Sequence, residues 1–139
     1  MKNVHTTNYY NTFIEIAEDS PIQTASVPPP KVDKTIATIQ FDMLYEHPYE
    51  YSSDDVLFET YAVKRNLTNK VEKDAEREFF FSKGQACFRS SPLTKRYGWG
   101  VHSNADGKIA IYPAGSDEYD KMVTDKKLTH VKAMRSKKA

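Results

Sequence analysis

Residues 83–113 read KGQACFRSSPLTKRYGWGVHSNADGKIAIYP, and this stretch is the most informative about the fold. Within it, Asn104-Ala105-Asp106-Gly107 separates two segments with apolar alternation, 99–103 and 108–112. An Asp-Gly pair between such segments is typical of the turn of a β-hairpin. The stretch therefore predicts two antiparallel strands, and we expect this hairpin to form the centre of a sheet.

The segments on either side predict further strands and helices. Residues 12–18 are rich in strand formers, and 128–134 has the composition of a final strand. Within the central stretch, 86–90 resembles a short strand and 91–96 a loop. Four helices are expected from capping residues and periodicity, at 32–46, from Ser52 or Ser53 to Asn66, at 70–82, and from Ser116 onward.

Two of these helices carry an apolar stripe at helical spacing. The stripe of 32–46 consists of Val32, Ile36, Ile39 and Met43. The stripe of 70–82 consists of Val71, Ala75 and Phe79, and the opposite face is strongly charged. Stripes of this kind usually face the core, so we expect both to be buried.

Together these elements predict an α+β fold. We expect an antiparallel sheet of four or five strands with three or four helices packed mainly on one face. A chain of 139 residues is most simply one domain, so we assign 1–139 to it. The basic residues from about 135 onward form a short solvated tail in this interpretation.

The composition argues against several classes of protein. A net charge of +1 is too small for a general nucleic-acid-binding protein, and the apolar runs are too short to cross a membrane. The single cysteine cannot form an internal disulfide, and the N-terminus lacks a secretion signal, so we expect a cytoplasmic protein. The four histidines have no partner at ligand spacing, so neither a metal nor another cofactor is expected.

Four motifs, in order along the chain, resemble one family. They are HTTNYY at 5–10, YSSDDVLF at 51–58, FFSKGQ at 80–85, and SPL at 91–93 followed by KRYGWG at 95–100 and His102. The family consists of small bacterial proteins catalogued as domain of unknown function 6157. The resemblance covers roughly residues 5–120 and implies a one-domain protein of the bacterial cytosol. It assigns no catalytic role to any residue.

The cations and rings of 83–102 are the best candidate for a functional site. Four basic residues and no acidic one lie between Lys83 and His102. Arginine offers a planar fork for a carboxylate or phosphate, and aromatic rings offer flat faces for a ring or base. We therefore predict a binding module for a small anionic or aromatic ligand, with a nucleotide as one option. The expected ligand-binding residues are Arg89, Lys95, Arg96, Tyr97, Trp99 and His102.

Strand alternation opposes part of this prediction. In a strand at 99–103, Trp99 and His102 point to opposite faces unless a bulge intervenes. Two alternatives for the same stretch therefore remain. Either Arg89, Arg96, Trp99 and His102 converge on one concave surface, or Trp99 packs in the core and the cations lie on a solvated loop. With Trp99 in the core, a loop wrapped around the sheet edge could still bring Arg96 and His102 together.

Two other functions remain open. The first is a small enzyme that uses His102 with Cys87 or Tyr97, with Asp106 orienting the imidazole. A lone cysteine is more often a small buried apolar residue, which weighs against Cys87 as a nucleophile. The second is a protein–protein interaction domain that uses the acidic N-terminal half. The adjacent Asp54 and Asp55 are explained by helix-dipole stabilisation.

Overall fold

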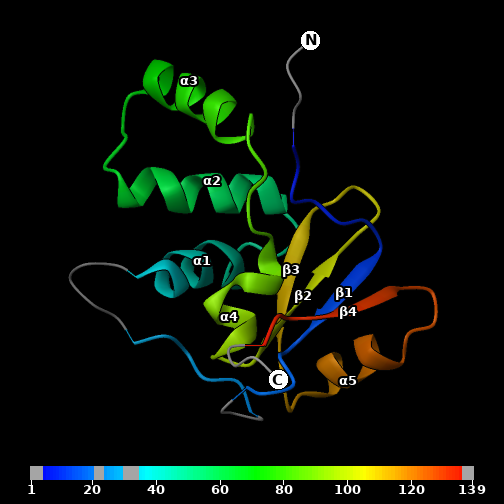
Figure 1. Cartoon of the computed structure of the whole chain (residues 1–139). Coiled ribbons are helices and arrows are strands. Elements are labelled where there is room, and N and C mark those ends of the chain that lie inside the picture. Colours follow the sequence, from blue (N-terminus) through cyan, green and yellow to red (C-terminus); the bar gives the residue numbers. More distant parts are fainter. Residues whose placement is uncertain (1–4, 21–23, 30–34, 136–139) are drawn as a thin grey trace.

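The structure is a computed structural model that describes residues 5–20, 24–29 and 35–135 (Figure 1). Its four strands form one sheet and are Thr12–Glu15 (β1), Trp99–Ser103 (β2), Ile109–Pro113 (β3) and Thr129–Lys132 (β4). Its α-helices are Ile36–Tyr45 (α1), Ser53–Lys64 (α2), Lys70–Phe80 (α3), Pro92–Lys95 (α4) and Asp117–Thr124 (α5). The α+β class and the four strands agree with the sequence prediction.

The strand order is β3-β2-β1-β4. The predicted hairpin is confirmed, since β2 pairs with β3 antiparallel and Val101 lies opposite Ile111. Its turn is held by the Asn104 side chain, which accepts hydrogen bonds from the backbone nitrogens of Asp106 and Lys108, both at 2.9 Å. Gly107 has a φ of 80°, a left-handed conformation that glycine adopts without strain.

The prediction of a purely antiparallel sheet is wrong, because β4 runs parallel to β1. After β3 the chain crosses through α5 and returns beside β1 in the same direction, with Ile14 opposite Val131. The first strand therefore lies between β2 and β4. The hairpin occupies one side of the sheet rather than its centre.

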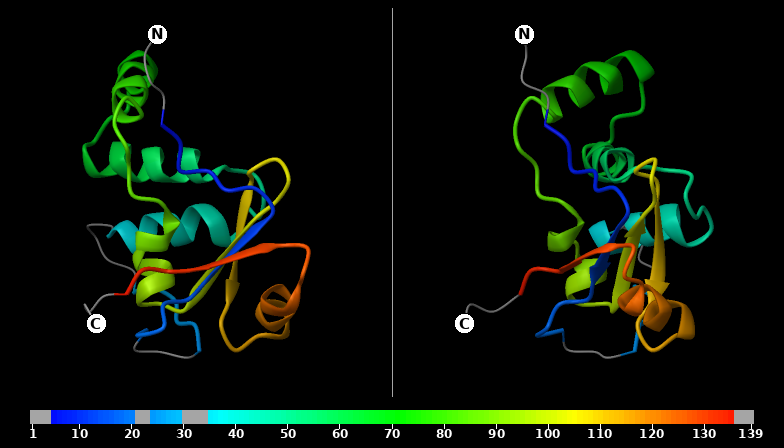
Figure 2. Two further views of the ribbon diagram at one scale, coloured as in Figure 1. Left: turned by 45° about the vertical axis from the view of Figure 1, so that its right-hand side comes forward. Right: turned by 90° about the vertical axis from the view of Figure 1, so that its right-hand side faces the viewer.

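Helices cover both faces of the sheet, whereas we expected them mainly on one. Ile14, Trp99 and Val101 pack in the core formed with α1, α2 and α4. Phe13 packs on the opposite face with Tyr119 of α5, with ring centroids 5.2 Å apart. The left view of Figure 2 shows the sheet between α1 and α4 on one side and α5 on the other.

Helices α1, α2 and α3 are stacked beside the sheet, with α3 farthest from α1 (Figure 1). The prediction for the apolar face of α3 is wrong. Val71 is 79% exposed and Phe79 58% exposed. The charged face points inward instead, where Lys73 pairs with Glu59 and Arg77 with Asp55.

The apolar stripe of α1 also differs from the prediction. Ile39 is buried, but Ile36 is 45% exposed, and Val32 lies outside the described residues. The helix buries Ala37, Thr38, Gln40 and Leu44 as well. Its most buried face therefore includes two polar residues that the periodicity of apolar side chains did not identify.

The link from α3 to the sheet differs from the predicted strand and loop. Phe88–Ser90 forms a 3-10 turn (η1), and Pro92–Lys95 forms the short helix α4. The Ser91 hydroxyl accepts a hydrogen bond from the nitrogen of Leu93, and Pro92 stands at the first helical position, where its missing N–H costs nothing. These two residues start a helix where we expected a loop.

Candidate functional site

Trp99 and His102 lie on opposite faces of the sheet. Trp99 is buried, its ring packs edge-on against Phe41 at 5.3 Å, and its Nε1 donates to the carbonyl of Ser26 at 2.9 Å. His102 is half-buried on the α5 face, where it contacts Tyr49. The two side chains point in opposite directions because the strand alternates regularly.

The other predicted ligand-binding residues lie around η1 and α4. The Arg89 Nε donates to the carbonyl of Lys132 at 2.7 Å, which ties η1 to β4. Tyr97 is half-buried against the core. Lys95 is half-buried and Arg96 exposed, and neither forms an ion pair with the part of the chain that the structure describes.

Cys87 is paired with Tyr9 rather than with His102. The Tyr9 hydroxyl and the Cys87 Sγ are 3.3 Å apart, and burial together with Cys87 raises the pKa of Tyr9 to about 12. The contact joins the N-terminal segment to the link between α3 and η1. The same two segments also meet where the His5 nitrogen donates to the carbonyl of Phe81 at 2.9 Å.

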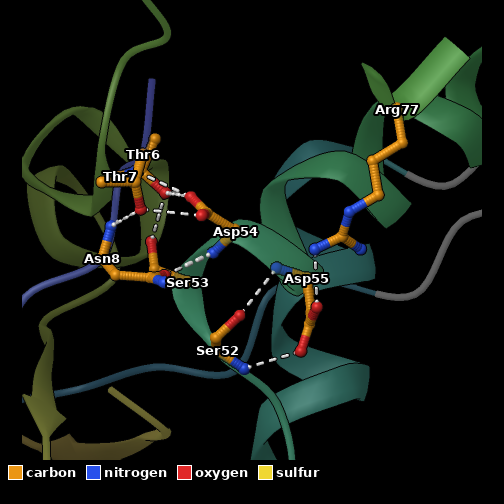
Figure 3. A network of polar contacts seen from close by, with 8 residues as sticks. All are labelled: Thr6, Thr7, Asn8, Ser52, Ser53, Asp54, Asp55 and Arg77. Atoms are coloured by element: carbon orange, nitrogen blue, oxygen red, sulfur yellow. Dashed lines mark hydrogen bonds and ion pairs between the residues drawn. The ribbon is translucent and has the colours of Figure 1, made fainter. Parts of the chain in front are cut away.

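A polar network joins the N-terminal segment to the start of α2 (Figure 3). The Asp54 carboxylate accepts hydrogen bonds from the Thr6 hydroxyl and from the hydroxyl and backbone nitrogen of Thr7, each at 2.7 Å. The Asn8 side chain accepts from the Asp54 nitrogen at 2.9 Å. The network joins residues from two of the four family motifs, HTTNYY and YSSDDVLF, and gives both a structural role.

Asp55 has a separate structural role. Its carboxylate accepts from the Ser52 nitrogen in a capping box and binds the Arg77 guanidinium at 2.8 Å (Figure 3). Burial raises the pKa of Asp55, but these hydrogen bonds and the Arg77 charge outweigh burial and lower it overall. The paired aspartates thus position α2 and α3, in agreement with a structural reading of the motif.

A pocket of about 400 Å³ opens between α1, α2 and the segment after α3. Its lining is mostly apolar and consists of Ile36, Gln40, Leu57, Thr60, Tyr61, Lys64, Arg65, Phe80, Gln85 and Ala86. The exposure of Ile36 is explained by its place in this lining. A mainly apolar pocket of this size with a few polar groups is typical of sites for small molecules.

Gln40 presents an unpartnered hydrogen-bond donor in this pocket. Its side chain is 2% exposed, and its Oε1 accepts from the Ser91 hydroxyl at 2.6 Å. The Ser91 oxygen also accepts a hydrogen bond from the Leu93 nitrogen at 3.1 Å. Within the described residues, the Gln40 amide nitrogen has no acceptor. No side-chain nitrogen or oxygen of the described residues is both fully buried and without a hydrogen-bond partner, so the Gln40 amide nitrogen is not sealed in the core and can donate to a ligand or water in the pocket.

The aromatic and cationic groups of the pocket lie together on α2 and at the end of α3. The Phe80 and Tyr61 rings are 4.8 Å apart, and the Arg65 guanidinium lies 4.7 Å from the centre of the Tyr61 ring. Arg65 is exposed and forms no ion pair with any residue described. The lining residues come from three separate segments of the chain, so no local sequence pattern indicates this pocket.

His102 belongs to a second cluster, on the α5 face of the sheet. Its Nδ1 lies 2.7 Å from the Tyr49 hydroxyl, which lies 2.7 Å from the Tyr112 hydroxyl. Burial lowers the pKa of His102, and the charge of Asp125 opposes that shift. Burial and the contact with Tyr112 raise the pKa of Tyr49. Burial therefore favours the neutral forms of the His102 imidazole and the Tyr49 phenol.

Two further properties follow from the described ranges. Nowhere in them do three or more His, Cys, Asp or Glu side chains come together as metal ligands. None of the helices described is long and apolar enough to cross a membrane.

Comparison with other proteins identifies the family alone. A search of curated proteins finds no match, and a search of solved structures finds none either. The resemblance carried by the four motifs is confirmed, because the chain belongs to the family of unknown function DUF6157, whose model matches residues 4–139.

Proposed function

We propose that this chain is a binding module for a small, largely apolar ligand with one anionic group. The ligand occupies the pocket between α1, α2 and the segment after α3. The observation that carries the proposal is the amide nitrogen of the pocket-lining Gln40, a hydrogen-bond donor that has no acceptor among the described residues. A carboxylate or carbonyl oxygen of a ligand would supply one.

The other groups of the lining support the same ligand class. Tyr61 and Phe80 form an aromatic wall, which favours a flat ring. Arg65 lies at the edge of that wall with its guanidinium on the Tyr61 ring, where it can hold an anion bidentately. This arrangement keeps the ligand class predicted from the sequence but assigns it to other residues.

The test is a titration followed by two-dimensional ¹H–¹⁵N NMR. The probes are indole-3-acetate, salicylate and adenosine monophosphate, with uncharged indole as the counterpart. We expect the side-chain amide signals of Gln40 to shift with at least one anionic probe at submillimolar concentration. If no probe shifts them by 5 mM, the pocket is not the binding site.

The residues predicted from the sequence give a second location that the same titration tests. If the shifts occur instead at Arg89, Lys95 and Arg96, the ligand binds at η1 and α4 and the pocket assignment fails. An Arg96→Gln variant separates the two locations, because Arg96 does not line the pocket. Unchanged affinity in this variant supports the pocket.

A further inference from the structure

The cluster around His102 lies away from the pocket and has a different chemistry. We propose that His102, Tyr49 and Tyr112 form a proton-transfer site, in which His102 Nε2 accepts a proton from a small uncharged substrate or its attacking water. Tyr49 and Tyr112 act as positioning residues that carry the proton onward. The site is independent of ligand binding in the pocket.

The geometry supports a continuous chain of hydrogen bonds. Tyr49 bridges the other two residues with its single hydroxyl, at 2.7 Å from His102 Nδ1 and 2.7 Å from the Tyr112 hydroxyl. A hydroxyl donates one hydrogen bond and can accept another, so Tyr49 can serve both contacts at once. His102 Nε2 makes no hydrogen bond with the described residues, which leaves this atom for a substrate.

The hydrogen-bond chain of His102, Tyr49 and Tyr112 can carry protons in either direction. In one arrangement His102 Nδ1–H donates to Tyr49, Tyr49 donates to Tyr112, and Nε2 has a free lone pair. When Nε2 takes a proton, the Nδ1 proton passes to Tyr49, the Tyr49 proton to Tyr112, and the Tyr112 proton to solvent. Each of the three groups loses one proton and gains one in this step, so the step adds no charge to the half-buried site.

The backbone of Tyr49 is unusual for a residue with a side chain. Its φ is 60°, in the left-handed region, and its nitrogen donates to the carbonyl of Ile109 at 2.9 Å. Strained residues of this kind cluster at functional sites, where the surroundings hold them in place. The hydrogen bond to β3 holds the loop so that the Tyr49 hydroxyl lies between His102 and Tyr112.

The surroundings indicate an uncharged substrate. Phe13 lies beside His102 on the neighbouring strand, and it packs in an apolar cluster with Tyr112, Met122 and Leu128. Several charged or titratable groups lie on this side of the sheet. Asp125 acts on His102 through its charge, and Tyr119 of α5 packs on Phe13. His130 and Glu15 form a pair beyond Phe13, and Lys132 lies next to that pair. Asp125 disfavours an anion near His102.

Hydrolysis of p-nitrophenyl acetate tests the proposal, because this small ester is uncharged and aromatic. Water attacks the ester carbonyl while Nε2 removes one of its protons, the carbonyl-carbon bond to oxygen breaks and p-nitrophenolate leaves with the electron pair, and the acetic acid formed loses its proton to solvent as acetate. We expect His102→Gln to lower the rate about a hundredfold, the lower end of general acid–base catalysis. The rate of the wild type should rise with pH through a midpoint below 6.5, the ordinary pKa of histidine, and then level off.

Three variants separate this proposal from a purely structural role. His130→Gln, which changes an exposed histidine on the same face, should leave the rate unchanged. Tyr49→Phe and Tyr112→Phe should lower the plateau rate, and Tyr49→Phe should also move the pH midpoint. The proposal is overturned if His102→Gln hydrolyses the ester as fast as the wild type. It is equally overturned if Tyr49→Phe lowers the melting temperature but leaves the rate and pH midpoint unchanged.

Discussion

The carboxylate of Asp54 holds Thr7 by two hydrogen bonds, one from the backbone nitrogen and one from the hydroxyl, both 2.7 Å long. The two residues are 47 positions apart in the sequence. Thr7 is buried, and it also lies 2.9 Å from the Ser53 hydroxyl. This contact fixes the N-terminal segment on α2 before the chain enters β1.

Asp54→Ala should therefore destabilise the protein by about 1–3 kcal/mol, because it leaves buried donors of Thr7 without an acceptor. The measurement is urea unfolding followed by fluorescence of the buried Trp99. Asp106→Ala in the exposed hairpin turn is the matched control and should change the stability little. Equal stability of the two variants would contradict the structural role of Asp54.

Gly100→Ala should also destabilise the protein, by about 1–3 kcal/mol, through overpacking. An added Cβ would lie 2.5 Å from Phe13 Cζ and 2.8 Å from Tyr119 Cε2, within the packing of α5 on the sheet. Gly84→Ala is the control, since the nearest atom there is 3.9 Å away. Thermal unfolding of both variants measures the difference. A melting temperature of Gly100→Ala equal to that of the control would mean that α5 does not pack as described.

Two substitutions, Gln40→Leu and Arg65→Gln, should each weaken the binding of an anionic probe in the pocket by roughly tenfold. Each variant loses about one hydrogen bond to a charged group, and the loss of one such bond has an effect of this size. Arg65→Gln should leave binding of uncharged indole unchanged, because its guanidinium recognises the anion. Calorimetric titration of each variant gives the affinities. Gln40→Leu also removes the acceptor of Ser91, so its melting temperature must be measured in parallel. A loss of indole binding in Arg65→Gln would contradict the assigned role.

The stability of the fold should fall on acidification because of Asp55. Its pKa in the folded protein lies below the ordinary value of 3.8, so its contribution is fully present above that pH. That contribution is lost as the pH falls through the lower, folded-state pKa. Urea midpoints at pH 7, 4 and 3 should therefore decrease less for Asp55→Asn than for the wild type. The control variant is Asp74→Asn, whose aspartate forms an exposed pair with Lys70. Its urea midpoint should decrease with pH as much as that of the wild type.

Local signals in the sequence were sufficient for the hairpin and for most helix starts. Asn104 and Gly107 form the turn within their own segment, and Ser52 caps α2 through Asp55, three residues away. The pairing of β4 with β1 depends on residues more than a hundred positions apart, such as Ile14 and Val131. No periodicity within either strand specifies such a partner, and antiparallel pairing was the more common choice.

The site residues were harder to predict for the same reason. His102 stood out in the sequence, but its partner Tyr49 lies in a loop that carries no pattern. Gln40 is a polar residue on a helix, and only the packing of α2 and of the segment after α3 places it in the lining of a pocket. The orientation of α3 was missed because periodicity identifies a stripe but not the surface it faces.

The inward-facing charges of α3 make its attachment sensitive to ionic strength. The helix is held on α2 by the Lys73–Glu59 and Arg77–Asp55 pairs and by the Phe80 ring, whereas the sheet is held by apolar packing. Dissolved salt weakens such partly exposed ion pairs, because the electrostatic screening length is about 10 Å at 0.1 M salt and becomes shorter at higher concentration. Amide hydrogen exchange in α3 should therefore speed up in 0.5 M sodium chloride while exchange in β1 and β2 stays slow. Because Phe80 at the end of α3 lines the pocket, loosening this helix would also change the shape of the proposed binding site.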